Sequence, residues 1–136
     1  KMSLPVIKKS ATPHIINIGS TAGKLAYKNG NVYCATKFAV DALNQSMRID
    51  LLPYGVKVTA INPGMAETEF SLVRFRGDAE RAKKVYENFE PLHAEDIADV
   101  AYYCATLPRH VCINDLTITS TNQANGIFSI KDSEKK

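Results

Sequence analysis

Three short runs of β-branched residues along the chain indicate buried strands. They cover residues 14–18, 56–61 and 113–119, and each of the first two is followed at once by a glycine-containing turn. Short apolar runs bounded by turn residues are typical of strands that are covered on both faces. The pattern therefore predicts three strands, well separated along the sequence.

Between these runs, apolar residues recur at steps of three and four, which is the spacing of one helix face. The longest such stretch follows Gly30 and Asn31 and stops before Pro53 and Gly55. Proline and glycine at this point are typical of a helix end. Shorter helices are predicted over 67–73, 78–88 and 94–106.

The order strand, helix, strand, helices, strand predicts an α/β fold with a parallel sheet covered by helices on both faces. In such sheets ligands bind beyond the carboxyl ends of the strands. The loops 19–23 and 62–65 leave the first two strands there, so we expect the chemistry in these loops. Residues 1–136 form one domain in this interpretation, with 120–136 as a flexible tail.

The composition fits this interpretation and excludes other classes. With 136 residues, 45% of them hydrophobic and 23% charged, the chain is typical of a globular domain. A net charge of +3 is too small to indicate a nucleic-acid surface, and no apolar run is long enough to span a membrane. Three cysteines without a CxxC pair favour reduced thiols and a cytoplasmic protein. Because position 1 is not methionine, we expect the chain to begin inside a longer protein.

Tyr33 and Lys37 lie one helical turn apart on the long predicted helix. A free phenol, with a pKa near 10, is a weak acid at neutral pH, and an ammonium held beside a phenol stabilises its phenolate. Tyr33 is therefore a candidate proton donor and Lys37 its tuning group. Ser20, in the loop after the first strand, would then hydrogen-bond a substrate oxygen. Alternatively, Tyr33 and Lys37 form a surface pair, and Ser20 only closes a turn.

Three segments together resemble the short-chain dehydrogenase/reductase family, over essentially the whole chain. They are INIGSTAG at 16–23, YCATK at 33–37 and INPGMAET at 61–68. The segment TEFSLVRFRGD at 68–78 and the later TNQA at 121–124 resemble the subgroup of NADP-dependent 3-hydroxy acid (serine or allo-threonine) dehydrogenases.

The resemblance implies a C-terminal half of a Rossmann-type sheet, with the three strands as neighbours and the first at an edge. It implies that Ser20, Tyr33 and Lys37 are catalytic, and that Tyr33 and Lys37 also contact the cofactor. It further implies cofactor contacts from Pro63, Gly64 and Thr68; a plain turn at 63–64 and a helix cap at Thr68 are the alternatives. The subgroup resemblance implies NADP as the cofactor, with NAD as the alternative, and hydride transfer requires no metal.

The glycine-rich phosphate turn and the NNAG segment of the family do not occur in this sequence. The N-terminal cofactor half is thus missing here, and we expect the chain alone to be poorly folded and inactive.

Arg74 and Arg76 are candidates to pair with a substrate carboxylate, because guanidinium matches carboxylate geometry. The alternative is a solvated basic face. The resemblance also implies a homodimer or homotetramer formed through the long helix.

For the full-length protein, the sequence and its resemblance therefore predict an oxidoreductase that transfers hydride between NADP and a secondary alcohol, namely a small 3-hydroxy acid such as serine. A non-catalytic homologue that serves as an association module is the alternative. A hydrolase that uses Ser20 is a weaker one, because no histidine is placed in sequence as its base.

Overall fold

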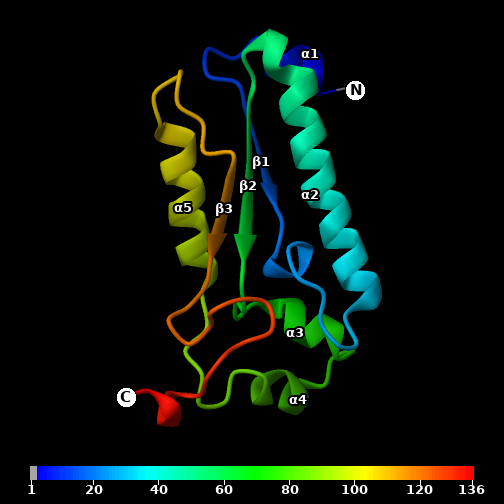
Figure 1. Ribbon diagram of the computed structural model, residues 1–136, viewed down its shortest axis with the longest axis vertical. Helices are drawn as coiled ribbons and strands as arrows, with labels where there is room; N and C mark the ends of the chain where they lie inside the picture. The colour runs from blue at the N-terminus through cyan, green and yellow to red at the C-terminus, as the bar shows by residue number, and fades with distance from the viewer. Residues whose placement is uncertain (1–2) are drawn as a thin grey trace.

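The computed structural model describes residues 3–136 and centres on a three-stranded parallel sheet. The strands are β1 (His14–Ile18), β2 (Lys57–Pro63) and β3 (Asp115–Ile118), in the order β1-β2-β3 (Figure 1). All three run in the same direction, so their carboxyl ends meet at one edge of the molecule. The α/β class and the strand order predicted from the sequence are confirmed.

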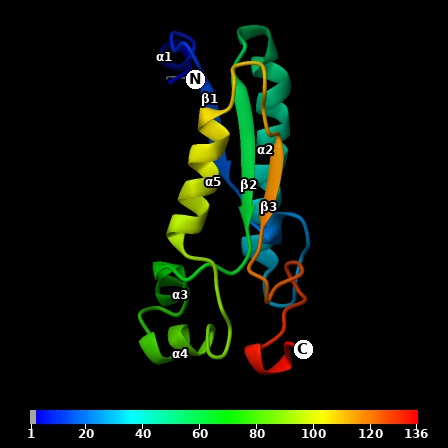
Figure 2. The ribbon, with the colours of Figure 1, turned by 90° about the vertical axis from the view of Figure 1, so that its left-hand side faces the viewer.

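Two long helices cover the two faces of the sheet. α2 (Asn31–Leu51) lies on one face and α5 (Ala94–Thr106) on the other, with β2 between them (Figure 2). The short helices α3 (Glu69–Arg74) and α4 (Ala79–Lys84) lie beyond the carboxyl ends of the strands (Figure 1). α1 (Leu4–Ile7) packs at the opposite end, and the 3-10 helices cover Thr21–Gly23, Leu52–Tyr54 and Asp132–Glu134.

The central strand β2 is buried along its whole length, because helices cover both its faces and strands pair with both its edges. Val58 and Ile61 are fully buried. Val58 also joins Leu51 and Val56 in a small core, against which side chains of α1, β1 and α2 pack. A strand in this position requires side chains that tolerate burial on both faces; the two polar ones in 56–61 are hydrogen-bonded, Lys57 Nζ to Leu107 O (3.2 Å) and Thr59 Oγ1 with His14 Nε2 (2.7 Å).

β1 lies at an edge of the sheet. Within residues 3–136 it pairs with β2 alone, and Ile18 at its end remains 49% exposed. This is the edge position expected from the sequence. An unpaired apolar edge is a template for pairing with a further strand.

Several predicted boundaries shift in the structure. β2 continues two residues beyond the predicted end, because Gly64 N still donates to Ile118 O (2.8 Å) and so keeps β3 paired. β3 is shorter than predicted, and α3 begins at Glu69 because Thr68 caps it. α4 ends at Lys84, four residues before the predicted end of its segment.

Residues 120–136 make specific contacts with one another. Gln123 forms an isolated bridge with Ser129, and buried Asn122 donates to Ile130 O (3.2 Å) and to Asp132 Oδ1 (2.9 Å). The flexibility expected for this segment stays a prediction. Among the residues that the structure describes, none of the helices combines the length and apolarity needed to cross a bilayer.

Candidate active site

A cavity of about 510 Å³ opens at the carboxyl edge of the sheet, between the loops after β1 and β2, the start of α2, and α3. Its walls include most of the residues expected from the sequence to form a site: Ser20, Tyr33, Lys37, Pro63, Gly64, Thr68 and Arg74. These residues come from segments up to 54 positions apart, and the parallel sheet brings them together.

Tyr33 and Lys37 line this cavity from adjacent turns of α2. Lys37 Nζ lies 5.8 Å from the centroid of the Tyr33 ring and donates a hydrogen bond to Ile18 O (3.2 Å). Burial lowers the pKa of the Lys37 ammonium below its usual value, because partial desolvation disfavours the charged form. The hydrogen bond that Lys37 donates to Ile18 O at the end of β1 therefore holds the ammonium beside the Tyr33 phenol.

Ser20 lies two residues after the end of β1, and its side chain is buried in the cavity wall. Its Oγ accepts a hydrogen bond from Ala22 N (3.1 Å), which caps the 3-10 helix Thr21–Gly23. The turn-closing role considered from the sequence is thus present. Because Oγ acts there as an acceptor, the Ser20 proton is left to donate to another group.

The loop after β2 is held by Gln123, which lies in the segment TNQA that carries the subgroup resemblance but was not expected to be a site residue. Buried Gln123 accepts a hydrogen bond from Met65 N (2.8 Å) and donates to Asn125 O (2.9 Å). A Cβ on Gly64 would lie 2.1 Å from Gln123 Oε1, so this close approach requires glycine. The spacing of 58 residues between Met65 and Gln123 leaves no local signal in the sequence.

Thr68 lines the cavity and also caps α3. Its Oγ1 accepts a hydrogen bond from Phe70 N (3.2 Å), so the cap considered from the sequence is present. Phe70, the second residue of α3, packs against Tyr33 with ring centroids 5.3 Å apart. α3 therefore closes one side of the cavity over the phenol.

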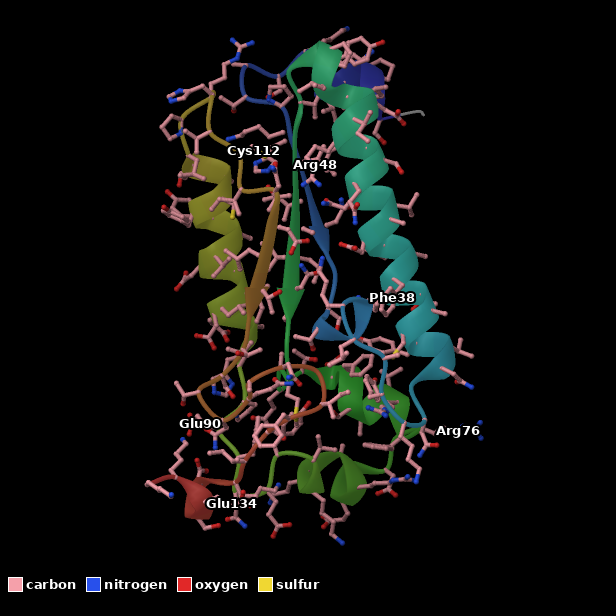
Figure 3. The ribbon with its side chains drawn as sticks, in the orientation of Figure 1. Phe38, Arg48, Arg76, Glu90, Cys112 and Glu134 are labelled. Atoms are coloured by element: carbon pink, nitrogen blue, oxygen red, sulfur yellow. The ribbon has the colours of Figure 1, made fainter. Side chains whose placement is uncertain are left out.

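The two arginines of the segment 68–78 lie in different places. Arg74, the last residue of α3, lines the cavity, whereas Arg76 lies outside the described lining, at the periphery of the molecule (Figure 3). Arg76 follows the helix end with φ at 56°, which turns the chain away from the helix direction. Within residues 3–136 the lining holds the cations Lys37 and Arg74 and no aspartate or glutamate, which favours an anionic ligand.

Tyr27 and Tyr86 also line the cavity and were not expected from the sequence. Burial raises the pKa of Tyr27, and the nearby positive charge of Arg74 partly offsets this rise. The Tyr86 hydroxyl is hydrogen-bonded to Ala66 O and to Ser71 Oγ. Neither tyrosine follows a periodic pattern that marks it as a site residue.

Comparison with known proteins agrees with this geometry. Residues 1–78 match the family model described as short chain dehydrogenase. The chain is 46% identical to "NADP-dependent 3-hydroxy acid dehydrogenase YdfG" of Salmonella typhi over 128 residues, covering 93% of this chain and 52% of that protein. It is 43% identical to "Sulfoacetaldehyde reductase 2" of Chromohalobacter salexigens over 125 residues, covering 92% of this chain and 50% of that protein.

Among solved structures, the chain resembles the closed form of serine dehydrogenase complexed with NADP+. The TM-score is 0.87 at 42% sequence identity, and the match covers 95% of this chain and 52% of that one. The chain therefore spans about half the length of the relatives that it matches.

Proposed function

Because this chain belongs to the short-chain dehydrogenase family, we propose that the full-length protein transfers a hydride between NADP and a secondary alcohol. The observation that carries the proposal is that Ser20, Tyr33 and Lys37 line one cavity at the carboxyl edge of the sheet. Relatives named NADP-dependent 3-hydroxy acid dehydrogenase and serine dehydrogenase support a small 3-hydroxy acid, such as serine, as substrate.

The residues of the cavity fit the nicotinamide end of such a cofactor. Gly64 lets Gln123 approach and hold the loop after β2, and the described lining offers hydroxyl and ammonium groups without a carboxylate. NADP, when bound, supplies or accepts the hydride. Pro63, Gly64 and Thr68 would hold it at the loop, and Lys37 would donate hydrogen bonds to its ribose, with NAD as the alternative cofactor.

Tyr33 is the proposed acid and base of the reaction. Its hydroxyl gives a proton to the carbonyl oxygen during reduction, and its phenolate takes the alcohol proton during oxidation. The Lys37 ammonium stabilises the phenolate form, and Ile18 O keeps that ammonium in place. Ser20 donates a hydrogen bond to the substrate oxygen, on which charge changes during the reaction.

Arg74 is the proposed partner of the substrate's acid group, with Arg76 as a second candidate. Arg74 supplies positive charge on the wall of the cavity that α3 forms. Hydrogen bonds between guanidinium and carboxylate are charge-assisted and often bidentate. A relative named for sulfoacetaldehyde supports the same anionic class, because a sulfonate also carries a negative charge.

The outer face of α2 supports the proposed homodimer or homotetramer. Val32, Leu43 and Ile49 on this helix are 72%, 59% and 73% exposed, and exposed large apolar side chains on one element are candidates for an association surface. A non-catalytic association module would use the same face. The free thiols of Cys34, Cys104 and Cys112 support a cytoplasmic setting.

The test is the activity of the full-length protein on a panel of 3-hydroxy acids with NADP and with NAD. We expect NADP-dependent oxidation of at least one small 3-hydroxy acid, and a lower kcat/KM with NAD. The absence of any turnover over the panel, with a folded protein that still forms oligomers, would favour the association module.

A further inference from the structure

The hydroxyl of Tyr86 joins two segments that form different walls of the cavity. It donates a hydrogen bond to Ala66 O (2.9 Å) and lies 2.7 Å from Ser71 Oγ. A phenol has one proton, and Tyr86 uses that proton toward Ala66. Ser71 must therefore donate to Tyr86, which fixes the direction of both hydrogen bonds.

Ala66 belongs to the loop after β2, and this loop is anchored independently of Tyr86. Gln123 holds Met65 N, while Leu92 N donates to Met65 O (2.9 Å) and Glu67 N donates to Leu92 O (2.8 Å). These contacts tie the loop to the segment after β3 and to the segment that precedes α5. The position of Ala66 O is therefore held by contacts that do not involve Tyr86.

Ser71 belongs to α3, a short helix of six residues. Ser71 is its only buried residue, and Leu72 and Val73 are 40% and 74% exposed. Isolated helices this short are unstable in water. Apart from the cap at Thr68, the contact between Ser71 and Tyr86 is therefore a main attachment of α3 to the anchored loop.

The position of α3 determines two features of the cavity. Phe70 on this helix packs against the ring of Tyr33, and Arg74 at its end supplies the positive charge. A shift in the position of α3 relative to the loop after β2 would therefore move both Phe70 and Arg74. Tyr86 touches neither side chain in its hydrogen bonds, so it acts on them through the helix.

We propose that Tyr86 is a positioning residue, which locks α3 to the loop after β2 and thereby sets the affinity for an anionic substrate. The proposal rests on the proposed function, because it assigns the anion to Arg74. It concerns only the hydroxyl, since the ring fills the same space in phenylalanine.

The first test compares the full-length wild-type protein with Tyr86→Phe on a 3-hydroxy acid and on a neutral secondary alcohol of similar length, with NADP. We expect the KM for the acid to rise about tenfold, with smaller changes in kcat and in the KM for the neutral alcohol. Tyr102→Phe is the matched control, because Tyr102 on α5 is 72% exposed, and it should behave as wild type. Equal losses on both substrates would overturn the proposal.

The second test adds Ser71→Ala. If Tyr86 acts through Ser71, the double variant should raise the KM for the acid no more than the larger of the two single changes. Independent, multiplying effects of the two substitutions would contradict a shared hydrogen bond.

A third measurement does not depend on activity. Amide hydrogen exchange should become faster over 69–75 in Tyr86→Phe and stay unchanged over 57–63. Unchanged exchange over 69–75 would overturn the proposal. A wild-type protein without NADP-dependent activity, whose α3 nevertheless loosens in Tyr86→Phe, would reject the proposed function and retain the role of Tyr86 in holding α3.

Discussion

The ammonium of Lys37 lies 5.8 Å from the centre of the Tyr33 ring and is held there by a hydrogen bond to the end of β1. This arrangement follows from two elements of the fold. α2 presents the two residues on one face, and the parallel pairing of β1 with β2 brings Ile18 to the same edge of the sheet. A positive charge beside a phenol at a strand end is the basis of the proposed proton transfer.

Replacement of Lys37 by arginine should change the alkaline side of the pH profile. Burial lowers the pKa of Lys37 from its usual value near 10.5, so the ammonium loses its charge at a lower pH than an exposed lysine does. We expect activity to fall at alkaline pH as this charge is lost. Arginine stays charged throughout the usable alkaline range, so Lys37→Arg should be less active but keep its remaining activity to higher pH. An unchanged alkaline limb in kcat/KM would contradict this role.

Arg74→Ala and Arg76→Ala form a matched pair. Arg74 lines the cavity and Arg76 lies at the periphery. Loss of a charged hydrogen-bond partner costs about 1.5–3 kcal/mol. We therefore expect Arg74→Ala to raise the KM for 3-hydroxy acids by about 10- to 100-fold and Arg76→Ala to have little effect. A neutral alcohol serves as the control substrate, and an equal loss on the acid and the neutral alcohol would rule out a carboxylate partner.

Gly64→Ala should weaken binding of NADP. The new Cβ would lie 2.1 Å from Gln123 Oε1 and 3.1 Å from Thr119 Cγ2. Relief of this clash requires Gln123 to leave Met65 N, which releases the loop after β2. Titration of the full-length variant with NADP should show at least about a tenfold rise in Kd. A wild-type Kd would show that this loop does not contact the cofactor.

The 136-residue chain, expressed alone, should lack a cooperative thermal transition and should not bind NADPH. β1 pairs with β2 alone within the described residues, and an apolar strand edge promotes aggregation. Calorimetry and NADPH fluorescence on the isolated chain test this expectation, with the full-length protein as control. A cooperative melt together with micromolar binding of NADPH would contradict it.

The regular elements of this fold could be predicted because their signals are local. The run 14–18 and the helical period that ends at Leu51 match β1 and α2, since burial on both faces and an amphipathic face leave clear patterns. The position of the Tyr33 and Lys37 pair at the strand ends follows from the same elements. β1, α2 and the Tyr33–Lys37 pair are thus determined by residues that lie only a few positions apart in the sequence.

The remaining parts depend on contacts between distant segments. Gln123 lies 58 residues from Met65, and Tyr86 lies 20 from Ala66, both within irregular segments where no period applies. Arg74 and Arg76 look equivalent in the sequence, but α3 ends between them and a positive φ at Arg76 separates their directions. The end of a six-residue helix is set by its cap and its packing, and single-sequence patterns locate such ends poorly.

The most direct test of the account is the steady-state activity of Tyr33→Phe in the full-length protein, with NADP and the best 3-hydroxy acid. Phenylalanine keeps the ring that packs against Phe70 and removes only the hydroxyl. We predict that kcat falls by about 10²- to 10⁴-fold, while the Kd for NADP and the melting temperature stay near those of the wild type. Turnover equal to that of the wild type would contradict the assignment of Tyr33 as the group that transfers the proton.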